Sequence, residues 1–486
     1  MIKLTVAELL LSLQSSLQSK TSERDINVDK NYLVTGIELN SKKVNPGNVF
    51  VAIKGLNHDG HKYLNEAKKN GAILAIVSDL QTDVDLPQVL VQNTRLALGD
   101  ITKYMASQWN KPKISITGSN GKTTTKFILA SILQQKAEVL CPIASFNNEI
   151  GVPLTMFQAN DNQWAGVFEI GTNHPGEITY LTNLIKSDVV ILTSVSQTHI
   201  GNFKDLTAIA HEKFDIFNNL KRGGTAVYHY DLVHKDILEA KLNKQADIKQ
   251  VTFGFNEQAD IWADEIVLGP DRTLFNLNYR TGEKITKAAI QLHLLGKHQV
   301  LNALAATAAA LALGLTIDDI KEGLSKVRPV NKRMQAIRMT KEAVIIDDSY
   351  NASPASVAAA LRYLAECMGL KILVLGDLGE LGDTAATEHT KIGQLAKELG
   401  VDVVFALGNF SKYVSEAFYS DNYAFEGRKY QEGFADKQEL SNTVIRCLKD
   451  VCQEEIPVTI LIKGSNFMKM WEVTDKLVAE WQVEKS

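Results

Sequence analysis

A short glycine-rich segment followed by lysine and threonine offers the clearest chemistry in this sequence. It runs from Gly118 to Thr124, between an apolar stretch with strand character and a stretch with helical spacing. Glycines let successive backbone N–H groups converge on phosphate oxygens, and the start of a helix adds partial positive charge there. In such a loop Lys122 neutralises the β- and γ-phosphates and Thr123 holds Mg²⁺. The predicted phosphate-binding residues are Gly118, Ser119, Asn120, Gly121, Lys122, Thr123 and Thr124.

The loop departs from the general phosphate-loop pattern at one position. That pattern, GxxxxGK[ST], requires glycine where this sequence has Ile116, so the loop is a shortened variant. A tight strand-to-helix turn without nucleotide is the alternative, but nothing structural requires Lys122 and Thr123 after the glycines. We therefore favour a nucleotide site.

A magnesium ion beside phosphates requires hard oxygen ligands. Glu169, at the carboxyl end of a predicted buried strand, is placed to supply one, although a helix cap or salt bridge would also explain it. His199 lies in a loop after another strand end and, taken alone, is typical of a surface histidine. Lys213, in a predicted helix over 206–220, is by itself typical of a solvated lysine.

These residues require a parallel α/β framework to bring them together. At 486 residues the chain is too long for one hydrophobic core, and we predict three domains, at 1–107, 108–328 and 329–486. The first mixes short apolar runs with helical stretches and is predicted to be a small α/β module. The polar segment 109–113 closes it.

The predicted central domain has the strand, loop and helix order of a doubly wound parallel sheet. Its predicted strands lie at 114–117, 166–170 and 188–192, with a helix over 302–313 and a polar hinge at 326–332. Between 225 and 295 short alternating runs and turn signals predict antiparallel strands added to this domain.

The predicted C-terminal domain resembles a Rossmann-type sheet. Its predicted strands lie at 343–346, 371–375, 401–407 and 458–462. The glycines at 376, 379 and 382 are spaced GxxGxxG rather than GxGxxG, so they indicate a dinucleotide site only weakly.

Composition excludes several classes of protein. With 52 basic and 56 acidic residues the net charge is −4, so no overall positive field exists to hold nucleic acid. We expect neither secretion nor a membrane span, because the apolar N-terminal run contains Glu8 and no uncharged run reaches about 18 residues. The four cysteines form no CxxC pair, which is typical of buried thiols in a reducing compartment, and we expect a cytoplasmic protein.

Several separated motifs together resemble the Mur ligase family over nearly the whole chain. Besides the glycine loop, these motifs are 147–153, 169–171, 296–302, 347–354, 375–382 and 463–465. Within the family, Asn147-Asn148-Glu149-Ile150-Gly151-Val152-Pro153 and Asp347-Asp348-Ser349-Tyr350-Asn351 favour the branch that adds D-alanyl-D-alanine. The resemblance implies an N-terminal module that binds a UDP-sugar, a central ATP-binding domain and a C-terminal Rossmann-like domain.

The same resemblance implies an activity. The expected reaction is ATP-dependent ligation of D-alanyl-D-alanine to UDP-N-acetylmuramoyl-tripeptide through an acyl phosphate, in the synthesis of cytoplasmic peptidoglycan precursors. The protein is expected to be a monomer that binds these two small substrates and no nucleic acid. No motif reveals the third residue of the stem peptide.

The resemblance also assigns roles to residues. Lys122, Glu169, His199 and Lys213 are the expected catalytic residues. Thr123, Glu169, His199 and Lys213 are expected to hold Mg²⁺, Lys213 as a carbamate formed from CO₂, which turns a cation into an anionic ligand. Asn302 is expected at adenine, Asp348 at ribose and Arg333 at the phosphates. The expected substrate-binding residues are Ser41, Lys42, Asn147, Asn148, Tyr350, Asn351 and Asp377.

Two features depart from the family pattern. Lys42 stands where arginine is common and lacks the guanidinium fork that binds phosphate through two hydrogen bonds. Asn466 follows Lys463-Gly464-Ser465 where many relatives have arginine, which leaves recognition of the dipeptide carboxylate open.

Two alternatives to this function remain open at this point. The chain could be another Mur-type or a folylpolyglutamate-type amide ligase, which shares the ATP core but not the substrate modules. It could also be a non-catalytic nucleotide-binding subunit, although such a subunit has no need for the metal-binding set.

Overall fold

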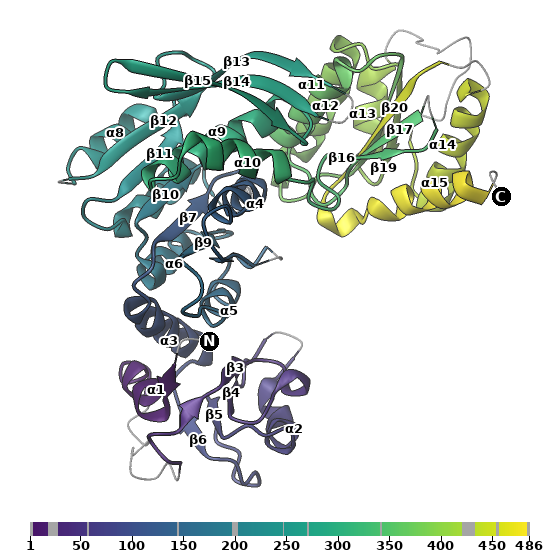
Figure 1. Cartoon of the computed structure of the whole chain (residues 1–486). Helices are drawn as coiled ribbons and strands as arrows, with labels where there is room; N and C mark the ends of the chain where they lie inside the picture. Colours follow the sequence, from purple (N-terminus) through teal and green to yellow (C-terminus); the bar gives the residue numbers. More distant parts are fainter. Residues whose placement is uncertain are drawn as a thin grey trace.

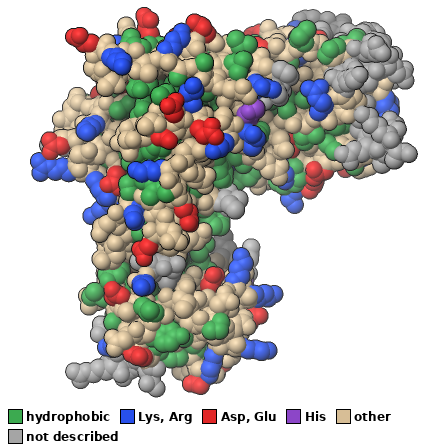
Figure 2. Space-filling view, viewed as in Figure 1, with side chains coloured by type: hydrophobic (Ala, Val, Ile, Leu, Met, Phe, Trp, Pro, Cys, Tyr) green, Lys and Arg blue, Asp and Glu red, His purple; other side chains and the backbone are tan. Residues whose placement is uncertain are grey.

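The computed structural model of this chain describes residues 3–17, 28–55, 58–142, 145–196, 203–245, 247–269, 272–340, 343–419, 433–452 and 456–483. Its three large sheets follow one another along the sequence, and Figure 1 shows the largest at the corner between the other two. The N-terminal module lies below this corner and the C-terminal domain to its right. In Figure 2 basic and acidic side chains are interspersed over the visible face.

The N-terminal module is a four-stranded parallel sheet between helices, which confirms the prediction of a small α/β module. Alternate residues of its strands point to opposite faces. Phe50 packs with α2 on one face, whereas Val49 and Val51 pack with α1 and α3 on the other. The sheet order is β3 (Gly36–Glu38), β4 (Asn48–Val51), β5 (Leu74–Val77) and β6 (Gln88–Leu90). The helices are α1 (Val6–Ser12), α2 (Leu64–Lys69) and α3 (Thr94–Gln108), and β1 (Leu4–Thr5) pairs with β2 (Leu33–Val34).

The central sheet has nine strands, in the order β15-β14-β13-β12-β11-β10-β7-β9-β8. From β13 to β8 neighbouring strands run parallel, and only β13, β14 and β15 pair antiparallel. The strands are β7 (Lys113–Thr117), β8 (Val139–Leu140), β9 (Ala165–Glu169), β10 (Val189–Leu192), β11 (Thr225–His229), β12 (Lys249–Gly254), β13 (Ile261–Leu268), β14 (Thr273–Thr281) and β15 (Lys284–Leu292).

The prediction of antiparallel strands over 225–295 is therefore correct for its second part and wrong for its first. β11 and β12 run parallel and extend the main sheet. The reason is the helix α8 (Lys235–Leu242), which carries the chain back along the sheet, so the next strand enters in the same direction. Alternating polarity predicts a strand, but it does not give the strand's direction.

Helices cover both faces of the central sheet, which makes it doubly wound as predicted. Val189 and Ile191 point toward α4, α9 and α10, whereas Val190 and Leu192 point toward α3, α5, α6 and α7. The helices are α4 (Lys122–Leu133), α5 (Gly151–Met156), α6 (Glu177–Ile185), α7 (Leu206–Phe214), α9 (Lys297–Ala312) and α10 (Ile317–Lys326). Because α3 packs here and on the N-terminal sheet, one apolar cluster runs continuously through both domains.

The C-terminal sheet has the order β16-β17-β20-β18-β19, with only β16 antiparallel. Helices on both faces confirm the Rossmann-like prediction. The strands are β16 (Gln335–Arg338), β17 (Ala343–Asp348), β18 (Leu370–Gly376), β19 (Val403–Leu407) and β20 (Val458–Lys463). The helices are α11 (Pro354–Ala365), α12 (Ala385–Glu398), α13 (Ser411–Phe418), α14 (Lys437–Cys452) and α15 (Trp471–Val483). Within the described residues, no helix has the length and apolar character needed to cross a membrane.

Candidate functional site

The glycine loop turns tightly between the end of β7 and the first residue of α4, as the sequence predicts. Gly118 has φ of +151° and Gly121 has φ of +84°, a region that other residues seldom adopt. A Cβ atom at Gly118 would collide with Oγ1 of Thr193, and one at Gly121 would collide with Oδ1 of Asn302. These glycines are therefore required both by backbone conformation and by lack of space.

Lys122 lies folded over this loop. Its Nζ donates hydrogen bonds to the carbonyl oxygens of Gly118, at 2.7 Å, and Ser119, at 3.3 Å. Burial lowers the pKa of Lys122, which the Glu169 carboxylate opposes and Arg333 reinforces. The ammonium group thus lies at the mouth of the loop, within electrostatic reach of Glu169 from the central domain and Arg333 from the C-terminal domain.

Glu169 ends β9 beside the loop and is almost completely buried, with 1% of its side chain exposed. Its Oε1 accepts hydrogen bonds from Oγ1 of Thr123 and Nδ2 of Asn147, both at 3.0 Å. Its Oε2 accepts none and faces Nζ of Lys126 at 3.5 Å. A buried carboxylate with one oxygen that accepts no hydrogen bond and the other beside a threonine hydroxyl fits a hard cation.

The remaining expected metal ligands are a histidine and a lysine. His199 lies outside the residues that the structure describes, and among the described residues no group of three or more His, Cys, Asp or Glu side chains could hold a metal ion. Lys213 is buried in α7, with 3% exposed. Burial lowers the pKa of Lys213 to about 7, with Lys122 adding to the effect and Glu212 opposing it.

The helix that carries Lys213 is anchored by the preceding residue. The Glu212 carboxylate accepts hydrogen bonds from the backbone N–H groups of Gly176, at 2.7 Å, and Ile178, at 3.0 Å, where α6 begins. A carboxylate at a helix N-terminus is favourable because it accepts from unpaired donors and meets the positive end of the helix dipole. This contact fixes α7 against the start of α6.

The C-terminal domain supplies the opposite wall of the site. Asp348 ends β17, forms an ion pair with Lys463 and accepts a hydrogen bond from the Met334 backbone N–H at 3.1 Å. The guanidinium of Arg333 lies 4.2 Å from the centre of the Tyr350 ring. The described residues also include one direct side-chain hydrogen bond from this wall to the glycine loop, from Ser353 Oγ to Asn120 Oδ1 at 3.1 Å.

A cavity of about 730 Å³ lies between these two walls, within the size range of small-molecule sites. Its lining includes predicted site residues of the glycine loop and predicted site residues of the C-terminal domain. The predicted residues that line it are Ser119, Asn120, Gly121, Lys122, Thr123, Thr124, Asn147, Asn148, Glu169, Asn302, Arg333, Asp348, Tyr350 and Asn351.

Of the predicted site residues that the structure describes, five do not line this cavity. Gly118 forms the back of the loop, and Lys213 lies buried within electrostatic reach of Lys122. Ser41 and Lys42 lie in the N-terminal module, where the Ser41 hydroxyl bonds to Glu66 and Lys42 is exposed. The Asp377 carboxylate accepts hydrogen bonds from the backbone N–H groups of Asn409 and Phe410 and is 5% exposed.

Among the residues at the site that were not singled out from the sequence as site residues, three are basic side chains. Lys126 contacts Glu169, Lys463 pairs with Asp348, and His298 lines the cavity. Burial lowers the pKa of His298 to about 4, so its ring is neutral at neutral pH. The four-residue spacing from Lys122 places Lys126 on the same helix face, which is the signal that could have identified it.

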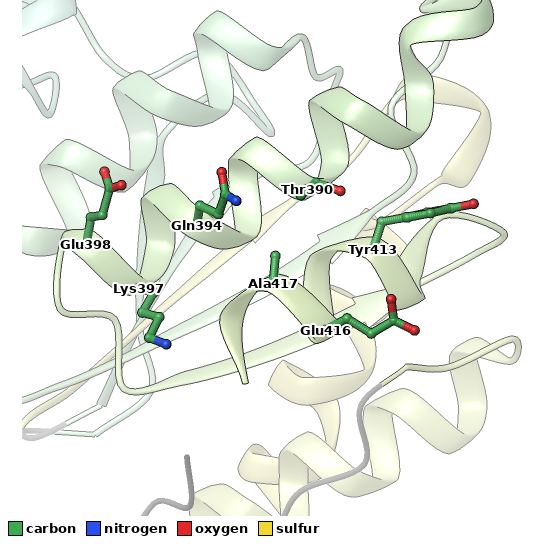
Figure 3. Close-up of a pocket in the computed structure, with 7 residues that line it drawn as sticks. All are labelled: Thr390, Gln394, Lys397, Glu398, Tyr413, Glu416 and Ala417. Atoms are coloured by element: carbon green, nitrogen blue, oxygen red, sulfur yellow. The ribbon is translucent and has the colours of Figure 1, made fainter. Parts of the chain in front are cut away.

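A second cavity, of about 500 Å³, lies on the C-terminal domain between α12 and α13. Figure 3 shows its side chains rising from these two helices. Lys397, Glu398, Glu416 and Tyr413 border it, and none of the predicted site residues does.

Comparison with known proteins covers all three domains. Three family descriptions match: "Mur ligase family, catalytic domain" at 33–105, "Mur ligase middle domain" at 116–310 and "Mur ligase, glutamate ligase domain" at 332–466. The chain is 34% identical over 481 residues to UDP-N-acetylmuramoyl-tripeptide–D-alanyl-D-alanine ligase of Escherichia coli (strain K12), covering 98% of this chain and 99% of that relative. It is 32% identical over 477 residues to the ligase of the same name from Haemophilus influenzae, covering 97% and 98%. A crystal structure of MurF from Acinetobacter baumannii superposes with a TM-score of 0.87 at 29% identity, covering 98% of this chain and 99% of that one.

Proposed function

The chain belongs to the Mur ligase family, and from that premise we propose that it joins D-alanyl-D-alanine to UDP-N-acetylmuramoyl-tripeptide with conversion of ATP to ADP and phosphate. Relatives named UDP-N-acetylmuramoyl-tripeptide–D-alanyl-D-alanine ligase match nearly the full length of the chain, so each domain has a counterpart in them. The enzyme acts as a monomer in the cytoplasm, in the synthesis of peptidoglycan precursors.

The observation that best supports this function is the cavity between the glycine loop and the residues of the C-terminal domain that face it. ATP binds there with its phosphates on the loop, where backbone N–H groups and the start of α4 attract anions. Lys122 moves from the loop carbonyls to the β- and γ-phosphates. Asn302, held against Gly121, contacts adenine, while Arg333 and Asp348 contact the phosphates and ribose from the other domain.

Thr123 and Glu169 would hold Mg²⁺, together with His199 and Lys213. Bound there, the ion neutralises phosphate charge. The lowered pKa of Lys213 supports its carbamylation, because only a neutral amine reacts with CO₂. Carbamylation would convert the buried amine of Lys213 into an anion that can serve as a metal ligand.

The chemistry requires two anions and one amine to meet. The terminal carboxylate of the tripeptide attacks the γ-phosphorus, forming an acyl phosphate and releasing ADP. The amine of D-alanyl-D-alanine then attacks the acyl carbon, forms the amide and expels phosphate. Lys122 holds the transferring phosphoryl group, so positioning and charge stabilisation supply the catalysis and no enzyme nucleophile is needed.

The substrates reach this cavity from the two flanking domains. Ser41 and Lys42 bind the UDP-sugar in the N-terminal module. Asn147 and Asn148 line the side of the cavity in the central domain, and Tyr350 and Asn351 line the side in the C-terminal domain. Asp377 acts indirectly, because its hydrogen bonds shape the loop that begins at Gly408.

Phosphate release tests the proposal. The purified protein is incubated with ATP, D-alanyl-D-alanine and UDP-N-acetylmuramoyl-tripeptide containing either lysine or diaminopimelate. Release that requires all three substrates, with one tripeptide favoured, is the expected result. Release only with a folate and glutamate would instead identify a folylpolyglutamate-type ligase. Nucleotide binding without any product would indicate a non-catalytic subunit.

A further inference from the structure

Lys126 is a fully buried lysine that the proposed reaction does not use. It lies one helical turn after Lys122 on α4, with 0% of its side chain exposed. Its Nζ lies 4.5 Å from the centre of the Phe127 ring, and the half-buried Cys141 thiol is close enough for the Lys126 charge to influence its pKa. A buried ammonium group in such surroundings requires a compensating anion.

Glu169 is that anion. The Lys126 Nζ lies 3.5 Å from Oε2 of Glu169, and both side chains are buried. Oε2 accepts no hydrogen bond, whereas Oε1 is held by Thr123 and Asn147. Oε1 of Glu169 is therefore held by hydrogen bonds from neutral groups, whereas Oε2 is stabilised by positive charge nearby.

Charge balance connects this pair to the metal. A carboxylate at 1% exposure without a cation nearby would be costly to bury, and Lys126 reduces that cost when no metal is bound, with the Lys122 charge adding to the effect. When a divalent cation binds Glu169, the same lysine becomes a nearby like charge and weakens binding. Lys126 thus has opposite effects on the metal-free and metal-bound states.

We propose that Lys126 is a positioning residue that acts as a built-in counter-ion. It stabilises Glu169 in the metal-free enzyme, and it lowers the affinity of the site for a metal ion. The proposal rests on the proposed function, in which Glu169 is a metal ligand. It predicts that a neutral residue at position 126 tightens metal binding while it destabilises the metal-free protein. A residue with only a packing role would lower stability equally in both states.

Mn²⁺ binding to the full-length protein with ADP present, followed by electron paramagnetic resonance, measures the effect. Lys126→Met, which keeps the length of the side chain without its charge, is expected to lower the Mn²⁺ Kd at least about tenfold, equivalent to about 1.4 kcal/mol. Lys126→Arg keeps the charge and is expected to stay within about threefold of wild type. A Lys126→Met Kd that equals or exceeds the wild-type value would overturn the proposal.

Lys113 provides a matched control. It is also a buried lysine, but its Nζ donates to the backbone carbonyls of Trp109 and Lys111. Lys113→Met is expected to lower the melting temperature by the same amount with and without Mn²⁺. For Lys126→Met the loss is expected without metal and is expected to shrink when Mn²⁺ is added, because tighter binding stabilises the folded state more. Equal losses for Lys126→Met in both conditions would contradict the proposal.

Glu169→Gln separates this proposal from the metal assignment. If Glu169→Gln leaves the Mn²⁺ Kd at its wild-type value, Glu169 is not a ligand and the metal site itself is wrong. If it weakens Mn²⁺ binding while Lys126→Met does not tighten it, only the role of Lys126 is wrong. Should Lys126→Met fail to fold, the double variant Lys126→Met/Glu169→Gln is expected to fold, since neither charge remains. Failure of both to fold would show that charge balance is not the reason for the lysine.

Discussion

Lys213 offers a test of the proposed carbamate through its protonation. Its pKa of about 7, lowered chiefly by burial, leaves roughly three quarters of the amine neutral at about pH 7.5, against about one in 800 for an ordinary lysine. The neutral amine is the form that reacts with CO₂, so burial increases it about 600-fold. Between about pH 7.5 and 6 the neutral fraction falls roughly eightfold, and carbamate should be lost in the same direction.

The assay follows carbamate and turnover together. The protein is equilibrated with ¹³CO₂ at a series of pH values, and the carbamate carbon is observed by NMR. The expected signal is strong near pH 7.5, declines toward pH 6 and is absent in Lys213→Ala. Turnover is expected to fall in CO₂-depleted buffer and to recover when bicarbonate is added. Small carboxylates such as acetate are expected to restore part of the activity of Lys213→Ala, because they replace the missing carbamate oxygens.

Lys113 again serves as the control. Burial lowers the pKa of Lys113 to about 8, yet it lies away from the cavity, so Lys113→Met should leave the carbamate signal unchanged. Normal turnover of Lys213→Ala without any additive would refute the role of the carbamate. An identical ¹³C signal in wild type and Lys213→Ala would refute its location.

Three further substitutions test the rest of the site. Lys122→Ala is expected to reduce turnover at least roughly 10²-fold, about 3 kcal/mol, while the melting temperature stays near wild type. Turnover close to wild type would show that the lysine has no part in the mechanism. Asp348→Asn leaves the Lys463 charge buried and unpaired, so it is expected to destabilise the protein by about 3–5 kcal/mol and to raise the KM for ATP. A free energy of unfolding in urea that matches wild type would contradict a stabilising Asp348–Lys463 ion pair. Gly121→Ala forces a Cβ against Asn302 and a left-handed backbone, so we expect a loss of about 1–3 kcal/mol and weaker ADP binding by calorimetry, and an unchanged Kd would show that the loop adapts.

Much of the fold follows from patterns that are local in the chain. The strand before the glycine loop was predicted at 114–117 and is observed at Lys113–Thr117, and the predicted buried strand at 166–170 is observed at Ala165–Glu169. Such runs are predictable because they are short, rich in β-branched or apolar residues and bounded by turn residues. The helix predicted over 206–220 instead ends at Phe214 and continues as a 3₁₀-helix over Asp215–Asn219. Helix periodicity does not distinguish these two forms at the end of a helix.

The sequence by itself determined the glycine loop, the order of the domains and the family, because each depends on residue types at short spacing. The positive φ angles of Gly118 and Gly121 are a local requirement that glycine meets. The tertiary structure alone decided which side chains meet across long separations. Parallel strands bring their carboxyl ends to one edge of a sheet, so Glu169 reaches Thr123 and Lys126 only once β7 and β9 are paired. No spacing in the chain records whether a buried lysine faces a carboxylate or a carbonyl, and that difference separates Lys126 at the site from Lys113 away from it.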